Sequence, residues 1–395
     1  MALYFAPEPK KDPEVVLASL LKGKFEEGSD RIDVTHEWLT YDEYPHPSGG
    51  NFQYFSVGLD PKDDQAIGKS KRVFLLSFLC ERRGIVGTNK TICALVNDLA
   101  SQTGGIPWDE EVRLLYSSEA WNAKRVDSWE GSLPDMSEHI NMHAYRDPEL
   151  IRIVTLGMRK FNLPDIAISE VIGGSSIAAG NTINVIMQAL VEGQYPEDDR
   201  LQLVLGSLKH KAARAKALEN PGENAEGEVM IQLDFIDSEE GDPANLLLDL
   251  TFPEVDAETR AERQGIAFDK LYGSTSDVQG IQSGDPDMQA ASKKARVDFL
   301  KLEDHFNQGL QPNERILVKH GFNVGEGLEY MWVELLRWKN NEIEGVLLND
   351  SYYDSKLRSG KRVSFKSAEV FDYIHQKPDG TEAGNETGKV LDSKR

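Results

Sequence analysis

The clearest alternation of apolar residues lies in the segment EYMWVELLRW (329–338). On an extended chain, Met331 and Val333 point to one side. Tyr330 and Trp332 point to the other side, so both faces of the predicted strand need cover. The preceding amphipathic helix, another domain or a partner must cover the Trp332 face, and we favour the helix. The helix is predicted at 288–306, and the other strands of this small curved sheet are predicted at 315–322, 342–349, 362–365 and 370–375.

Upstream of this sheet, helical and extended patterns alternate. Ile92, Leu95 and Leu99 recur at spacings of three and four, which predicts a helix over 89–105. The apolar run 71–80 before it suits a buried strand. Further strands are predicted at 31–39, 52–59, 138–145, 149–158, 165–174, 229–236 and 245–252, and further helices at 12–23, 175–193 and 199–220. The pattern predicts an α+β protein: a layered α/β N-terminal region followed by a small helix-plus-curved-β-sheet C-terminal module.

Changes in composition predict the domain boundaries. Residues 253–287 are rich in Gly, Asp, Ser and Gln, so we expect a linker with little regular structure. Residues 377–395 are polar and are predicted to be a disordered tail. Between and before these segments we expect an α+β region of one or two subdomains over 1–220, a β-hairpin extension of it over 221–252, and a β-rich module over 288–376.

The charge of the chain is unevenly distributed. Its 395 residues include 44 Lys and Arg against 66 Asp and Glu, a formal net charge of −22. Residues 288–376 and 377–395 each hold equal numbers of acidic and basic side chains, so the acidic excess lies upstream. A field of this sign repels nucleic-acid phosphates and anionic membrane surfaces, and we expect neither as a partner.

The cysteines and the apolar runs bear on the cellular location. Cys80 and Cys93 lie in apolar runs and are expected to be buried, reduced thiols. No apolar stretch approaches the length of a transmembrane helix, and the first residues lack the pattern of a signal peptide. These features predict a cytoplasmic protein.

Two segments carry residues suited to an enzyme. Gly84–Thr91 follows an apolar run and opens a helix, as a phosphate-binding loop does, but Asn89 replaces its second glycine. The alternative is a helix start capped by Thr88 or Asn89. Trp108–Glu111 gathers three carboxylates, which suit either a divalent cation or an ordinary polar turn.

Two further segments have weaker chemical signals. The glycines and serines of GGSS (173–176) precede a predicted helix, where backbone N–H groups can hold an anion but a serine cap is the more common arrangement. His139 and His143 share one side of a predicted strand. Their separation of about 13 Å is too large for one metal ion.

Several short motifs of the C-terminal segment carry a family resemblance. They are A-x-x-x-A-R (291–296), ILVK (316–319), EYMWV (329–333), GVLLND (345–350) and VFDY (370–373). Together they resemble the YegJ-like family of bacterial domains, which implies an architecture and a bacterial cytoplasmic setting but supplies no reaction. Ser351 and Lys361 depart from that family, where we expect proline and aspartate. Upstream, residues 104–121, 153–166 and 241–253 resemble a companion bacterial domain that is often fused to the YegJ-like domain and is also of unknown function.

We favour a non-catalytic interaction or accessory protein that binds another polypeptide, because the aromatic strand suits binding and no catalytic arrangement stands out. This hypothesis assigns no catalytic residue, cofactor or metal ion. Two alternatives remain: a metal- or nucleotide-dependent enzyme using Trp108–Glu111 or Gly84–Thr91, and an acidic immunity or antitoxin-type protein. The candidate binding face comprises Glu329, Tyr330, Trp332, Asn349, Tyr352 and Tyr373.

Overall fold

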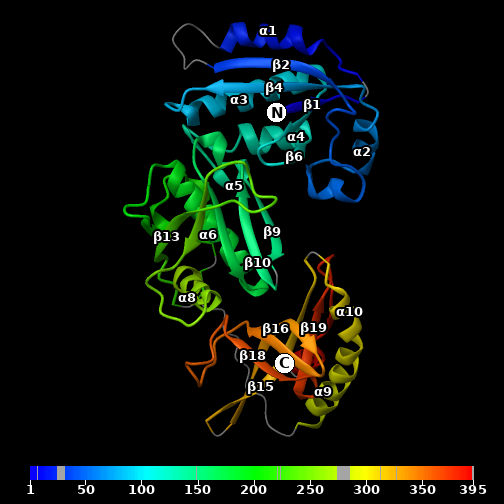
Figure 1. The fold of residues 1–395 in the computed structure, drawn as a ribbon, viewed down its shortest axis with the longest axis vertical. Coiled ribbons are helices and arrows are strands. Elements are labelled where there is room, and N and C mark those ends of the chain that lie inside the picture. The colour runs from blue at the N-terminus through cyan, green and yellow to red at the C-terminus, as the bar shows by residue number, and fades with distance from the viewer. Residues whose placement is uncertain are drawn as a thin grey trace.

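A computed structural model gives the fold, an α+β arrangement with a layered α/β N-terminal region and a C-terminal helix-plus-sheet module, as predicted. Within the described residues the chain forms three six-stranded sheets and one two-stranded sheet. The large sheets follow one another along the long axis of the molecule in chain order (Figure 1). The described residues are 1–6, 8–24, 32–147, 149–219, 221–222, 224–273, 285–311, 313–325 and 327–393.

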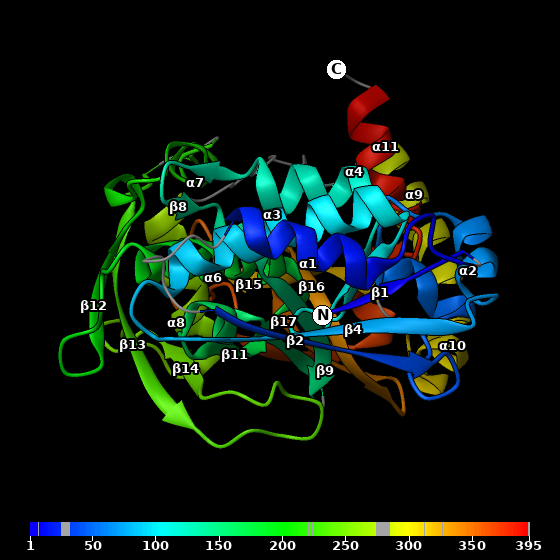
Figure 2. The same cartoon turned by 90° about the horizontal axis from the view of Figure 1, so that it is seen from above.

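The first sheet has helices packed against both of its faces. On one face lie α1 (Pro13–Lys24) and α3 (Ile85–Thr103), which run along the strands in Figure 2. On the other face, α2 (Pro61–Ile67) and the helical turn Gly49–Tyr54 contribute to a second apolar cluster around Tyr4. The strands, in spatial order, are β2 (Ile32–Thr40), β4 (Arg72–Cys80), β1 (Ala2–Tyr4), β5 (Ile106–Asp109), β6 (Leu114–Tyr116) and β3 (Ser56–Val57).

The second sheet is mixed, because β11 and β14 pair in parallel while its other strands pair antiparallel. Helices α6 (Ser176–Val191) and α8 (Arg260–Tyr272) bury apolar side chains against it. Its strands, in spatial order, are β12 (Arg200–Val204), β13 (Glu228–Ile236), β14 (Leu247–Thr251), β11 (Asp165–Val171), β10 (Leu150–Leu156) and β9 (Asn141–Asp147). Short elements α4 (Ser118–Trp121), β7 (Trp129–Glu130), β8 (Leu133–Pro134) and α5 (Met136–His139) connect it to the first sheet.

The single helix predicted over 199–220 is wrong. Residues Arg200–Val204 form β12, and only Lys211–Ala217 form a helix, α7. Leu203 lies opposite Val229 of β13 and is buried. The pairing with a strand distant in sequence therefore overrides the local helical pattern.

The predicted linker also contains a helix. Thr259 caps α8, and its hydroxyl and the Glu262 carboxylate form a reciprocal capping box. Phe268 and Leu271 of α8 are buried in the core of the second sheet. The Thr-x-x-Glu signature at 259–262 is the local signal for this helix within a polar segment. Residues 274–284 of the predicted linker lie outside the described residues.

The third sheet belongs to the C-terminal module. Helices α9 (Pro286–Phe299) and α10 (Glu303–Gln308) replace the single helix predicted over 288–306. Ala295 and Phe299 of α9 are buried against the sheet. Its strands, in spatial order, are β18 (Arg362–Lys366), β17 (Glu342–Leu347), β16 (Gly327–Lys339), β15 (Arg315–Val324), β19 (Val370–Gln376) and β20 (Glu382–Gly384).

The polar C-terminal segment is structured up to residue 393, contrary to the predicted disordered tail. It forms β20 and the helix α11 (Glu386–Ser393), which contacts α9. The buried Asp372 carboxylate accepts hydrogen bonds from the Thr387 N–H at 2.7 Å and the Thr387 hydroxyl at 2.5 Å. One buried carboxylate therefore anchors a helix whose own sequence is too polar to indicate burial.

None of the helices in the described ranges combines the length and the apolar character needed to cross a membrane.

Candidate functional site

The C-terminal sheet has one face that forms the core of its module. Met331 and Leu335 are buried there together with Phe299 of α9. A register shift in β16 between Leu335 and Arg337 places Trp338 in the same core, where its ring stacks on Phe299 with centroids 4.2 Å apart. Helix α9 therefore covers the Met331 face, and not the Trp332 face for which a helical cover was expected.

The domain of the second sheet covers half of the opposite face. The Gly174 N–H donates a hydrogen bond to the Glu334 carboxylate at 3.2 Å. A Cβ atom at Gly173 would lie 2.5 Å from the same carboxylate, so a larger residue there would displace the carboxylate from this position. The backbone before α6, whose N–H groups could hold an anion, therefore binds the carboxylate of Glu334 from the C-terminal module. The apolar contacts around it involve Leu150, Ile172, Ala261, Leu336, Val346 and Leu348.

The other half of this face carries aromatic side chains. The rings of Tyr330 and Phe371 lie with centroids 4.1 Å apart. Gly321 pairs with Tyr330, and its missing side chain leaves room for the tyrosine ring to cross β15. The Lys319 ammonium lies 5.3 Å from the centre of the Trp332 ring. We call Lys319, Tyr330, Trp332 and Phe371 the aromatic face.

Three other residues of the predicted binding face shape its rim. The buried Glu329 carboxylate accepts hydrogen bonds from the Ser351 hydroxyl and, at 2.8 Å, from the Tyr352 N–H. Asn349 accepts a 3.4 Å hydrogen bond from the Trp332 N–H. The Tyr352 side chain is 75% exposed. Glu329 and Asn349 therefore hold β16 against the loop that follows β17, and the Tyr352 side chain of that loop projects into solvent.

Tyr373 does not lie on this face. Its side chain is buried in the core of the module, with its ring centroid 6.0 Å from that of Phe299. The pairing of β15 with β19 shifts register between Lys319 and His320, which leaves Phe371 as an extra residue. This bulge turns Phe371 toward the aromatic face, although strict alternation would place it with Tyr373.

The carboxylates of Trp108–Glu111 do not form an open cluster. Asp109 is fully buried, and its Oδ2 atom lies 2.6 Å from the Lys160 ammonium and 3.5 Å from the Arg125 guanidinium. Burial raises the pKa of Asp109, but the two cations outweigh it and lower the pKa below its usual value. We call Asp109, Arg125 and Lys160 the sealed cluster; it connects the first sheet to the turn after β10.

Gly84–Thr91 does not form an open loop. Gly84 adopts a φ of 80° and the helix α3 begins at Ile85, so the rest of the segment forms its first turns. The Asn89 side chain donates to the Lys160 carbonyl at 3.2 Å, and the Lys90 ammonium donates to the Gly131 carbonyl at 2.6 Å. The side chains of Asn89 and Lys90 therefore link α3 to neighbouring segments, and the segment does not have the form of a phosphate-binding loop.

The histidines of 138–145 also differ from the predicted strand. His139 ends the short helix α5 and is fully buried, where its Nε2 atom lies 3.1 Å from the Ser128 hydroxyl. Burial is the main cause that moves its pKa well below the usual range. His143 lies on β9. The two side chains therefore belong to different elements.

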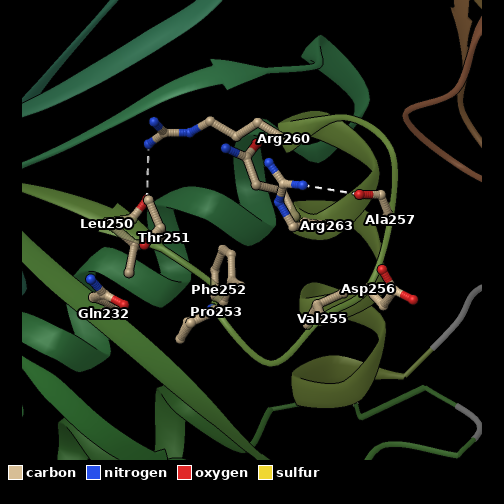
Figure 3. Close-up of a pocket in the computed structure, with 11 residues that line it drawn as sticks. Gln232, Leu250, Thr251, Phe252, Pro253, Val255, Asp256, Ala257, Arg260 and Arg263 are labelled. Atoms are coloured by element: carbon tan, nitrogen blue, oxygen red, sulfur yellow. Dashed lines mark hydrogen bonds between the residues drawn. The ribbon is translucent and has the colours of Figure 1, made fainter.

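A pocket of about 420 Å³ lies beside the start of α8 (Figure 3). Its two arginines already have partners. Arg260 makes two hydrogen bonds to the Asp249 carboxylate, at 2.9 and 2.6 Å, and Arg263 donates to the Ala257 carbonyl. Arg260 therefore links α8 to β14, Arg263 holds the turn before α8, and both guanidinium groups already have partners inside the protein.

Three residues of the C-terminal module form a cluster that the sequence did not reveal. The Nε2 atoms of His305 and His375 lie 2.7 and 2.6 Å from the same Oε1 atom of Glu314. We call these residues the His–Glu–His cluster. They come from α10, from the residue before β15 and from β19, so their spacing of nine and 61 residues matches no local motif.

The carboxylate of this cluster is ionised over the usual pH range. Burial raises the pKa of Glu314, but hydrogen bonds from the Gln311 N–H and the two histidines outweigh it and hold the pKa at about 2. An ionised carboxylate only accepts hydrogen bonds, so both Nε2 atoms carry the bridging protons. The side chains of Glu314 and His375 are 3% and 12% exposed, whereas that of His305 is 42% exposed.

The fold and these sites define an α+β protein with three large sheets in the described residues, the last of which forms a β-rich C-terminal module. Residues 285–394 match the model of a family described as "Uncharacterized protein conserved in bacteria (DUF2314)". The match covers β20 and α11 together with the rest of the module, and the resemblance of the upstream region to a companion domain stays a prediction. No curated protein and no solved structure matches the chain.

Proposed function

We propose that this protein is a non-catalytic binding protein that docks another polypeptide on its aromatic face. The observation that carries the proposal is the division of one sheet face into two halves. The second domain covers the half around Glu334, while Tyr330, Trp332 and Phe371 form the other half beside the exposed Tyr352. Tyr and Trp dominate binding energies at protein interfaces, because they bury a large area and keep a polar group for hydrogen bonding.

The arrangement of the two enzyme-like segments also supports a binding protein. The Asp109 carboxylate is committed to Lys160 and Arg125 inside the protein. Lys90 donates to a main-chain carbonyl. Neither the Trp108–Glu111 carboxylates nor the Gly84–Thr91 segment presents the convergent, accessible groups that a metal- or nucleotide-dependent enzyme requires.

The test begins with cross-linking of the full chain in cells and identification of the attached polypeptide, which is then purified. Calorimetric titration of that polypeptide into the wild-type chain should give saturable binding. Trp332→Ala should weaken the affinity by about 2 kcal/mol, or roughly 30-fold, because a buried interface tryptophan is lost.

Tyr195→Ala is the matched control, since Tyr195 is an exposed aromatic residue of the second domain. It should leave the affinity unchanged. Equal affinities for the wild-type chain and a folded Tyr330→Ala/Trp332→Ala variant would contradict the proposal.

A further inference from the structure

The His–Glu–His cluster has the composition of a transition-metal site. Two imidazole nitrogens and one carboxylate oxygen converge, and all three ligand atoms lie within 4.8 Å of one another. Imidazole nitrogen suits divalent zinc, iron, nickel and copper, whereas magnesium and calcium take mainly oxygen ligands. This donor set favours a transition-metal ion over the abundant hard cations.

The support around the ligands holds them in place. Ile316 pairs with His375 across β15 and β19, so the residue before β15 is fixed beside that histidine. The Gln311 N–H donates to the Oε2 atom of Glu314 at 2.9 Å, which orients the carboxylate and leaves Oε1 toward the two imidazoles. Hydrogen bonds of this kind to a ligating carboxylate commonly support protein metal sites.

The hydrogen bonds inside the cluster define what a metal ion would replace. Both Nε2–H groups donate a hydrogen bond to Oε1, and a metal ion would take the position of these two protons. In a neutral imidazole this proton moves to Nδ1 of the same ring, and in an imidazolium, whose Nδ1 is already protonated, it leaves to solvent, so that a neutral ring binds the metal in either case. With metal–ligand bonds of about 2.0–2.1 Å in tetrahedral geometry, each nitrogen would move about 0.7 Å farther from the oxygen than it is now.

The cluster is open to solvent on one side, so a bound metal ion could have water as a ligand in addition to the three protein ligands. His305 is half-exposed at one side of the cluster, while Glu314 and His375 are buried. The exposed side gives an ion a route of entry and leaves room for water as a further ligand. Three protein ligands with an open position differ from the closed four-ligand sites that have a purely structural role.

The geometry points to His305, Glu314 and His375 as the ligands of one divalent transition-metal ion of the zinc class, with water completing the coordination. This site is separate from the aromatic face, and its existence does not depend on polypeptide binding there.

The experiment uses the full chain without an affinity tag, stripped of metal with a chelator and titrated with Zn²⁺ by calorimetry. We expect one Zn²⁺ per chain, with no competition from an excess of Mg²⁺ or Ca²⁺. X-ray absorption at the zinc edge should show nitrogen and oxygen neighbours at about 2.0–2.1 Å and no sulfur.

His305→Ala, His375→Ala and Glu314→Gln should each weaken zinc binding by more than about 100-fold, because loss of a ligand exceeds the roughly 10- to 100-fold effect of losing a supporting hydrogen bond. His36→Ala is the matched control, since His36 is exposed to a similar degree, near Glu14, in the first domain. It should bind zinc as the wild-type chain does.

His305 is the decisive position, because its exposed side chain can be removed with the least risk to folding. Absence of stoichiometric binding by the wild-type chain would overturn the site. Wild-type affinity in folded His305→Ala, or an equal loss in His36→Ala, would overturn it as well.

Discussion

The sealed cluster and the His–Glu–His cluster each place one carboxylate between two cationic or potentially cationic side chains, but they differ in access to water. Asp109 and Arg125 are buried, the Lys160 side chain is only 9% exposed, and the Asp109–Lys160 ion pair joins the first sheet to the turn after β10. In the His–Glu–His cluster, His305 is open to solvent. A guanidinium and an ammonium cannot act as ligands at neutral pH, whereas an imidazole can. Both clusters contain one carboxylate, so the carboxylate does not distinguish them. The type of cationic side chain and its exposure to solvent decide whether the cluster is a structural ion pair or a site where a metal ion can replace the proton.

The largest effect is expected in the sealed cluster. Lys160→Met leaves the Asp109 carboxylate buried with only Arg125 at 3.5 Å. Breaking a buried pair typically costs about 3–5 kcal/mol, because a charge remains without compensation, and we expect about 3 kcal/mol here. The measurement is the free energy of unfolding in urea.

Lys211→Met is the control for this substitution, since Lys211 and Glu130 form an exposed ion pair. Such pairs contribute about 0–1 kcal/mol. A cost for Lys160→Met no larger than that of the control would mean that the sealed cluster does not hold the domains together.

A smaller, pH-dependent effect is expected for Glu314→Gln. The native state lowers the pKa of Glu314 from 4.5 to about 2, so its stabilising contribution is present above pH 4.5 and is lost as the pH falls through about 2. Two hydrogen bonds to a charged group are weakened, and we expect a cost of about 2 kcal/mol at pH 7.

The measurement is the difference in unfolding free energy between the wild-type chain and Glu314→Gln in metal-free buffer at several pH values. The difference should shrink steadily from pH 5 toward pH 2. A difference that grows as the pH falls would show that the carboxylate is not held ionised by its neighbours.

The smallest effect is expected at the C-terminal helix, where hydrogen bonds from Thr387 hold a buried carboxylate. Thr387→Val removes the hydroxyl that donates to buried Asp372 but keeps the N–H bond. The expected cost is about 1.5 kcal/mol in the urea unfolding experiment. Thr381→Val, in the exposed turn before β20, is the control. No difference between the two variants would support the disordered tail that the composition predicted.

The sequence predicted the local parts of the candidate sites. Alternation along 329–338 identified the strand and placed Tyr330 and Trp332 together on one side. The α+β class followed from the order of helical and extended patterns. These features depend on residues close in the chain, where side-chain period alone sets the geometry.

The tertiary structure decided which of the predicted helices and strands form, and which distant residues their side chains contact. The bulge at Phe371 separates it from Tyr373, and the pairing with β13 turns a helical pattern into β12. Glu334 takes the anion position at the start of α6, across 160 residues of sequence. His305, Glu314 and His375 meet only because α10 and β19 flank the start of β15. Long-range strand pairing and burial of charge set these contacts, and neither leaves a signal in the spacing of the residues.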